Sequence, residues 1–127
     1  MRIFLVRHAQ AAPGEPDDLR PLTDEGRATA RALAERLASK NPDAVVSSPL
    51  LRARETAEPI ARAAGVEIHA DDRLAPGATV ADLSSAVSGQ GHVVVVVGHQ
   101  PDCGEIVLAL TGEQRSFAPG AFAELEL

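Results

Sequence analysis

Three runs of apolar residues, rich in valine, predict buried β-strands. They span Arg2–Arg7, Ala44–Ser48 and His92–Gly98. Apolar and polar positions do not alternate within them, which is typical of strands in a parallel sheet that helices cover on both faces. A shorter run at Val66–His69 predicts a fourth strand. The tail Ala121–Leu127 does alternate, and this pattern predicts a half-exposed strand at the edge of the sheet.

Apolar residues spaced three and four positions apart predict four helices between the strands. The first spans Asp24–Ser39, with Thr23 as its N-cap. The second ends at Gly65 and contains Pro59, which lacks a backbone N–H group, so we expect a kink or a late helix start there. The apolar positions are Ala30, Leu33, Ala34 and Leu37; Ala57, Ile60, Ala61 and Ala64; Val80, Leu83 and Val87 after Thr79; and Cys103, Ile106, Val107 and Leu110 between Pro101 and Gly112.

Strands and helices alternate along the chain, which predicts the α/β class. We expect a three-layer α/β/α sandwich with a mostly parallel central sheet and an edge strand at the C-terminus. The length of 127 residues suits one domain that covers residues 1–127. The segment Ala9–Pro21 carries three prolines and a glycine and is the least regular part of the chain.

The charge of the chain argues against several classes of partner. The sequence has 12 Lys and Arg against 18 Asp and Glu, so its net charge is −6 and we expect no binding to nucleic acid or to an acidic membrane. The longest apolar run, Val93–Val97, is too short to span a bilayer, and Met1–Val6 carries no targeting leader. A single cysteine excludes an internal disulfide, and no Cys/His set has zinc spacing. We therefore expect a globular cytoplasmic protein.

Basic and titratable side chains follow the carboxyl ends of the three buried strands. The first strand ends in Arg7-His8, the second leads through Ser48 to Arg52, and the third ends in Gly98-His99. Ligands of an open α/β sheet bind outside these ends, so we expect two imidazoles and two guanidiniums at one edge. Such a set needs an anion, and phosphate fits the guanidinium geometry best. The sequence therefore predicts a phosphate site at this edge.

Four segments around these residues form a set of motifs. They are Leu5-Val6-Arg7-His8-Ala9, Arg20-Pro21-Leu22-Thr23-Asp24-Glu25-Gly26, Ser48-Pro49-Leu50-Leu51-Arg52-Ala53 followed by Thr56-Ala57, and Val97-Gly98-His99-Gln100-Pro101. In content and order, this set resembles the histidine phosphatase superfamily, whose fold is phosphoglycerate mutase-like. The short chain leaves little room for a lid between the last two motifs, and in this it resembles the small bacterial phosphohistidine phosphatases of the SixA type.

The resemblance implies a role for each matching residue. His8 would be the nucleophile that takes the phosphoryl group and forms a phosphohistidine intermediate. Arg7, Arg52 and His99 would hold the phosphoryl oxygens, and Arg20 matches an additional arginine of the pocket. The resemblance implies a reaction without metal or cofactor. The expected partner is a phosphorylated protein, either a histidine phosphotransfer protein or a phosphocarrier, or a small phosphorylated metabolite.

The sequence departs from longer members of the family at one informative place. Those members carry an acid after a leucine near the middle of the chain, where this sequence reads Arg73-Leu74-Ala75-Pro76-Gly77. An alkoxide leaving group needs a proton from such an acid, whereas an imidazole, with a pKa near 6.5, needs much less help. The absence of the acid therefore favours P–N bonds, with Asp72 and Asp102 as the two candidates to supply a proton from a neighbouring loop.

Phosphohistidine on a protein is thus the expected substrate, and two alternatives stay open. One is a small-molecule phosphomonoesterase of the same superfamily. The other is a non-catalytic phosphoprotein-binding module, although the sequence retains every residue of the expected phosphate clamp. His69 and His92 lie at less informative places and are interpreted as surface or structural residues. Cys103 lies on the apolar stripe of the last helix, which predicts core packing rather than chemistry.

Overall fold

A computed structural model describes residues 1–127 and contains a single five-stranded sheet with strand order β3-β2-β4-β1-β5. Four strands run parallel, and β5 pairs antiparallel with β1 at the edge, which confirms the predicted α/β class and its mostly parallel sheet. The strands are β1 (Arg2–Arg7), β2 (Ala44–Ser47), β3 (Ile68–Ala70), β4 (Val93–Gly98) and β5 (Phe122–Glu126). The helices are α1 (Asp24–Ala38), α2 (Leu51–Ala64), α3 (Val80–Val87) and α4 (Asp102–Thr111), with 3-10 turns η1 (Asp17–Leu19) and η2 (Asp72–Leu74).

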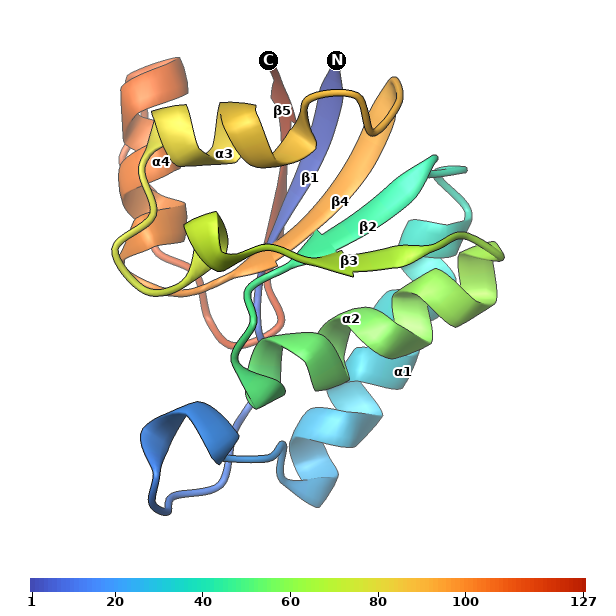
Figure 1. Ribbon diagram of the computed structural model, residues 1–127, viewed down its shortest axis with the longest axis vertical. Helices are drawn as coiled ribbons and strands as arrows, with labels where there is room; N and C mark the ends of the chain where they lie inside the picture. Colours follow the sequence, from blue (N-terminus) through green and yellow to red (C-terminus); the bar gives the residue numbers. More distant parts are fainter.

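The helices cover both faces of the sheet, as the unbroken apolar strands predicted (Figure 1). Successive side chains of a strand point to opposite faces, so each buried strand contributes to two cores. Ile3 and Leu5 of β1 pack in the cluster that contains α3 and α4, whereas Phe4 and Val6 pack in the cluster that contains α1 and α2. The three layers of the expected sandwich follow from this alternation.

The ends of β2, β4, β5 and α1 lie one residue from those predicted, and two regions differ by more. The strand expected at Val66–His69 begins two residues later, because the N–H of Val66 bonds back to the carbonyl of Ala61 and completes the end of α2. The late start expected near Pro59 is wrong, since α2 begins at Leu51 and continues through the proline. The buried apolar face of α2 extends to both sides of Pro59, and this packing keeps the helix continuous.

The irregular segment between β1 and α1 is fastened at its base. A bridge joins Ala11 to Leu22, and the carbonyl of Gln10 accepts the backbone N–H of Thr23, the N-cap of α1. Gly26 lies so close to the Gln10 carbonyl that a Cβ atom there would overlap with it. The segment therefore leaves β1 and returns to α1 beside the carboxyl ends of the parallel strands (Figure 1). None of the helices is long and apolar enough to cross a membrane.

Candidate active site

The carboxyl ends of β1 and β4 bring two histidines together. Arg7 and Gly98 are neighbours in the register of these strands, and the backbone N–H of His8 donates to the Gly98 carbonyl at 3.0 Å. His8 and His99 each follow the last residue of their strand, and their ring centroids lie 5.2 Å apart with an angle of 60° between the rings. Two residues far apart in the sequence thus share one site.

One nitrogen of the His8 ring is held by the backbone. Its Nδ1 lies 2.7 Å from the carbonyl oxygen of Ala9, which can only accept, so Nδ1 carries the proton and Nε2 has a free lone pair. Ala9 is fully buried, and its own N–H donates to Thr56 Oγ1 at 3.0 Å. The hydrogen bond at Nδ1 therefore fixes the orientation of the His8 ring and leaves Nε2 free.

Burial is the main cause that lowers the pKa of His8 below its ordinary value. The hydrogen bond to Ala9 opposes this effect, and the nearby guanidiniums of Arg52, Arg7 and Arg20 lower the pKa further. The charges of these three arginines therefore act on one imidazole; strand ends alone predicted Arg7 and Arg52 there, and the family resemblance added Arg20. The neutral form of His8, which is the nucleophilic form, is favoured at pH 7.

The second histidine is buried and neutral. Only 3% of His99 is exposed, and its Nε2 lies 2.7 Å from Ser48 Oγ, which in turn accepts the backbone N–H of Leu50. Burial, followed by the charges of His8 and Arg52, lowers the pKa of His99 to about 4. His99 therefore acts in the ligand-free protein as a neutral hydrogen-bonding group rather than as a cation.

The side chain of Arg7 has an unsatisfied donor. Its Nη1 donates to the Phe117 carbonyl at 2.7 Å, while its Nε is buried without a hydrogen-bond partner. A buried, charged donor without a partner is costly, and an anionic ligand is one means of satisfying it. The segment that leads into β5 closes over this end of β1, because the N–H of Gly120 bonds to the carbonyls of Arg7 and His8.

Arg52 comes from the first turn of α2 rather than from the end of β2, and only 7% of it is exposed. Its guanidinium bonds to Asp17 twice, through the Asp17 carbonyl and carboxylate. Arg20 bonds to the carbonyl of Ala12 through Nε and to the same Asp17 carboxylate through Nη1. Asp17 thus joins two of the arginines named from the sequence.

Asp102 holds the loop around Gly77, which follows the stretch where the sequence lacks the expected acid. The buried carboxylate of Asp102 accepts the backbone N–H groups of Gly77 at 2.8 Å and Ala78 at 3.1 Å. Asp72 is exposed and makes no hydrogen bond through its side chain, next to the ion pair between Asp71 and Arg73. The structure therefore gives Asp102 a role in fixing the backbone of this loop. No three His, Cys, Asp or Glu side chains are grouped as a metal ion would need.

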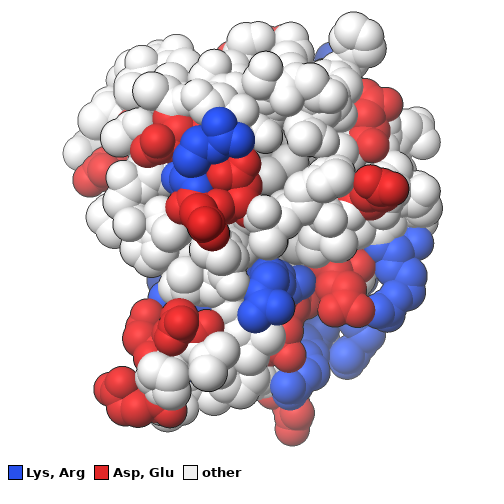
Figure 2. All heavy atoms as spheres, in the orientation of Figure 1, with Lys and Arg blue, Asp and Glu red and all other residues white.

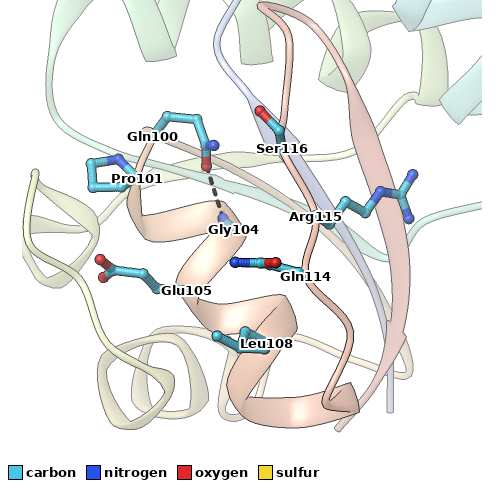
Figure 3. Close-up of a pocket in the computed structure, with 8 residues that line it drawn as sticks. All are labelled: Gln100, Pro101, Gly104, Glu105, Leu108, Gln114, Arg115 and Ser116. Carbon is cyan, nitrogen blue, oxygen red and sulfur yellow. Dashed lines mark hydrogen bonds between the residues drawn. The ribbon is translucent and has the colours of Figure 1, made fainter.

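A groove lies along α4, and Figure 3 shows the residues that line it. Its volume is about 480 Å³, and it lies between α4 and the segment that carries Gln114 and Ser116. The side chain of Gln100 folds back to accept the N–H of Gly104 at 2.8 Å. The groove starts one residue after His99, but none of the five residues named as the site lines it or any of the other three cavities.

Charge over the rest of the surface is mixed. Figure 2 shows acidic and basic side chains interspersed on one face, without a broad field of one sign. Cys103 is buried, and burial raises the pKa of its thiol to about 12, in agreement with its predicted role in the core. His69 is partly exposed beside Glu67, and His92 is exposed at the start of β4.

Three contributors to the site were missed by the sequence analysis or received no role there. Asp17 was not singled out, although its position three residues before Arg20 is typical of a local ion pair. Ser48 directly follows β2 and so faces the same sheet edge as the histidines. The Phe117 carbonyl, which holds Arg7, is a backbone group in an irregular segment, and no sequence signal marks it.

Comparison with known proteins places this geometry in a family. The profile of the histidine phosphatase superfamily (branch 1) matches residues 3–76. An uncharacterized protein of Picosynechococcus sp. is 37% identical over 115 residues, which are 83% of this chain and 70% of that protein. The probable phosphoglycerate mutase GpmB of Photorhabdus laumondii is 37% identical over 81 residues, which are 58% of this chain and only 37% of that protein.

Solved structures give the same assignment over the full fold. The protein histidine phosphatase SixA complexed with tungstate superposes with a TM-score of 0.87 and 30% identity over 100% of this chain and 88% of that one. The putative phosphohistidine phosphatase SixA from Agrobacterium tumefaciens gives a TM-score of 0.82 and 31% identity over 97% of this chain and 89% of that one. The motifs, the fold and these relatives agree, and the chain belongs to the histidine phosphatase superfamily.

Proposed function

We propose that this chain is a phosphatase that hydrolyses phosphohistidine on a protein through a covalent phosphohistidine at His8, without a metal. The observation that carries the proposal is the hydrogen bond of 2.7 Å from His8 Nδ1 to the Ala9 carbonyl, which leaves Nε2 as a nucleophile among three guanidiniums. A neutral imidazole held in one tautomer is a good nucleophile near pH 7.

In the first step, His8 Nε2 attacks the phosphorus atom and the bond from phosphorus to the substrate's imidazole nitrogen breaks. The leaving imidazole, protonated on its other nitrogen, departs as a neutral ring. The unsatisfied Nε of Arg7 and the guanidinium of Arg52 would hold the phosphoryl oxygens during the transfer. Positioning and charge stabilisation are the main demands of phosphoryl transfer, and arginines meet both.

In the second step, water attacks the phosphorus of phosphorylated His8, the P–N bond breaks, and inorganic phosphate and neutral His8 result. His99 would contribute to both steps as a neutral donor. If the Ser48 hydroxyl donates to Nε2, the proton of His99 lies on Nδ1 and can be offered to a phosphoryl oxygen. The low pKa of His99 keeps the ring in this neutral state in the free protein.

Two features support a P–N bond on a protein over an alkyl phosphate. Oδ2 of Asp102 accepts the backbone N–H groups of residues 77 and 78, which favours a structural role for this carboxylate over that of the family's missing acid. An alkoxide would therefore leave without a general acid, whose proton transfer typically raises the rate by about 10²–10⁴-fold. Two similar solved structures carry the name of phosphohistidine phosphatases.

The test is a comparison of rates in the presence of a chelator. The substrates are a protein phosphorylated on histidine and a panel of alkyl phosphomonoesters. We expect fast loss of phosphohistidine, slow ester hydrolysis, and a mass increase on His8 after rapid quenching at alkaline pH. The variant His8→Ala should lose at least about 10³-fold in rate, since it removes the nucleophile.

The matched control is His69→Ala, which removes a partly exposed imidazole on β3 and should leave the rate unchanged. Comparable or faster ester hydrolysis would contradict the P–N preference and favour a small-molecule phosphomonoesterase. Phosphate binding without turnover on either substrate would favour a phosphoprotein-binding module. An unchanged rate in His8→Ala would exclude the mechanism.

A further inference from the structure

Asp17 lies between two arginines of the phosphate site and contacts both. Its Oδ1 lies 2.9 Å from Arg20 Nη1, and its Oδ2 lies 3.2 Å from Arg52 Nη2. Its backbone carbonyl also accepts Arg52 Nη1 at 2.9 Å. The two arginines come from different segments of the chain, so Asp17 is the group through which they meet.

These contacts also fasten the tip of the segment that carries Asp17. Residues 13–19 make hydrogen bonds only among themselves, with Arg20 and with Arg52. The bonds with Arg52 are the two that its guanidinium donates to Asp17. The base of the segment is held separately, through the pairing of Ala11 with Leu22. The position of the tip, and with it the position of Arg20, therefore depends on Asp17.

The bridge leaves both arginines able to bind a ligand. A guanidinium has five N–H donors. Asp17 takes two from Arg52, and Asp17 and Ala12 take one each from Arg20, so three donors remain on each side chain. Without an anion between them, the two cations would repel each other and Arg20, the more exposed of the pair, would be free to turn toward solvent.

We propose that Asp17 is a positioning residue that fixes the guanidiniums of Arg20 and Arg52 at the spacing a tetrahedral oxyanion needs. The inference rests on the phosphoryl site of the proposed function and adds to it a residue that touches the arginines rather than the substrate. A carboxylate with one oxygen on each guanidinium is suited to this role, because Asn has a single acceptor oxygen and would directly face one guanidinium with its NH₂ group.

The experiment measures direct binding of tungstate by calorimetry, so its result does not depend on which phosphorylated substrate the enzyme prefers. We expect Asp17→Asn to weaken tungstate binding about tenfold, in line with the loss of charge-assisted contacts. Asp17→Glu keeps a carboxylate and should recover part of the affinity. The matched control is Asp18→Asn, which removes the same charge from the next residue, an exposed side chain without a hydrogen bond or ion pair.

A double-mutant cycle shows whether Asp17 acts through Arg20. In the background of Arg20→Ala, the effect of Asp17→Asn on tungstate affinity should shrink from about tenfold to about threefold, because one of the two bridged guanidiniums is gone. Fully additive effects would overturn the positioning role. Far-UV circular dichroism and a cooperative thermal transition should show that Asp17→Asn and Asp18→Asn are both folded at the temperature of the binding measurement.

The remaining outcomes separate the inference from the proposed function. If Asp17→Asn and Asp18→Asn changed tungstate affinity equally, Asp17 would act only through its charge. This result would overturn the positioning role but leave the proposed function standing. Tighter tungstate binding by Asp17→Asn would also overturn it, since Asp17 would then compete with the ligand. If wild-type protein binds no tungstate, the phosphoryl site of the proposed function fails, and the inference fails with it.

Discussion

At the scale of single residues, neutral imidazoles distinguish this site from a simple cluster of cations. The pKa of His8 is lowered mainly by burial, and the pKa of His99 falls to about 4 from burial and the charges of His8 and Arg52. Both rings are therefore neutral at pH 7, and the positive charge of the site comes from arginines. Under the proposed function, an arriving phosphoryl group would meet the charges of the arginines and a free lone pair on His8.

This arrangement predicts a dependence of stability on pH. Between about pH 6.5 and pH 4, His99 is protonated in the unfolded chain but neutral in the folded protein. The free energy of unfolding therefore decreases as the pH falls through this range. One pKa unit corresponds to about 1.4 kcal/mol, so His99 alone should account for roughly 2–3 kcal/mol over this window. His99→Gln keeps a polar side chain but does not titrate.

Urea unfolding at pH 7 and pH 4.5 measures this effect. The free energy of unfolding of the wild type should fall more than that of His99→Gln, by about 2 kcal/mol. The acidic residues are present in both proteins, so their contributions cancel in the comparison. Equal losses in the two proteins would show that His99 keeps an ordinary pKa in the folded state.

At the scale of elements, the segment between β1 and α1 shapes the site through its packing on the first turn of α1. Gly26 is required there because a Cβ would overlap with the carbonyl of Gln10, at the base of the segment that carries Asp17 and Arg20. Gly65 serves a different purpose, since it ends α2 with a positive φ of 68°, and a Cβ there would meet no atom within 4 Å.

Substituting each glycine by alanine should separate these two roles. Gly26→Ala should lower stability by about 1–3 kcal/mol through overpacking and lower kcat/KM about tenfold, because the displaced segment carries Arg20 away from the site. Gly65→Ala should cost about 1–2 kcal/mol from its left-handed backbone and leave kcat/KM unchanged. Both are read from urea unfolding and steady-state kinetics below the unfolding transition. Unchanged kinetics in Gly26→Ala would show that the segment does not position the arginine.

At the scale of the whole molecule, the sheet separates two cores. Ile60 of α2 belongs to the core on one face and Ile106 of α4 to the core on the other, and both are buried. The net charge of the chain is −6, yet the guanidiniums of Arg7, Arg20 and Arg52 gather near His8 at one sheet edge. The strands between the two cores thus carry the histidines and Arg7 of the candidate site at their carboxyl ends.

The separation of the cores predicts additive effects on stability. Ile60→Val and Ile106→Val should each cost about 0.5–1.5 kcal/mol, and the double variant should cost their sum to within about 0.5 kcal/mol. Denaturant unfolding of the two single variants and the double variant tests this. A larger deviation from the sum would mean that strain passes through the sheet from one layer to the other.

Local patterns in the sequence were sufficient for most of the fold. The span of β1 follows from its apolar run, and Thr79 and Gly112 mark the start of α3 and the end of α4 as predicted. The prediction failed at two places: packing keeps α2 helical through Pro59, so the late helix start is wrong, and β3 begins two residues later than predicted because Val66 completes the end of α2. Boundaries depend on the competition between neighbouring elements, which a local pattern does not contain.

The sequence by itself determined the α/β class, the family motifs and the identity of His8, His99, Arg7 and Arg52 as the residues to examine, because strand ends and motif spacing are properties of the chain order. Only the tertiary structure showed that Asp17 joins Arg20 to Arg52, that the Phe117 carbonyl holds Arg7, and that Asp102 is bound to the loop at Gly77. Each of these contacts joins side chains or backbone groups whose meeting depends on how an irregular segment folds onto the sheet. Such meetings leave no periodic trace in the sequence, because they depend on distances in space rather than on intervals along the chain.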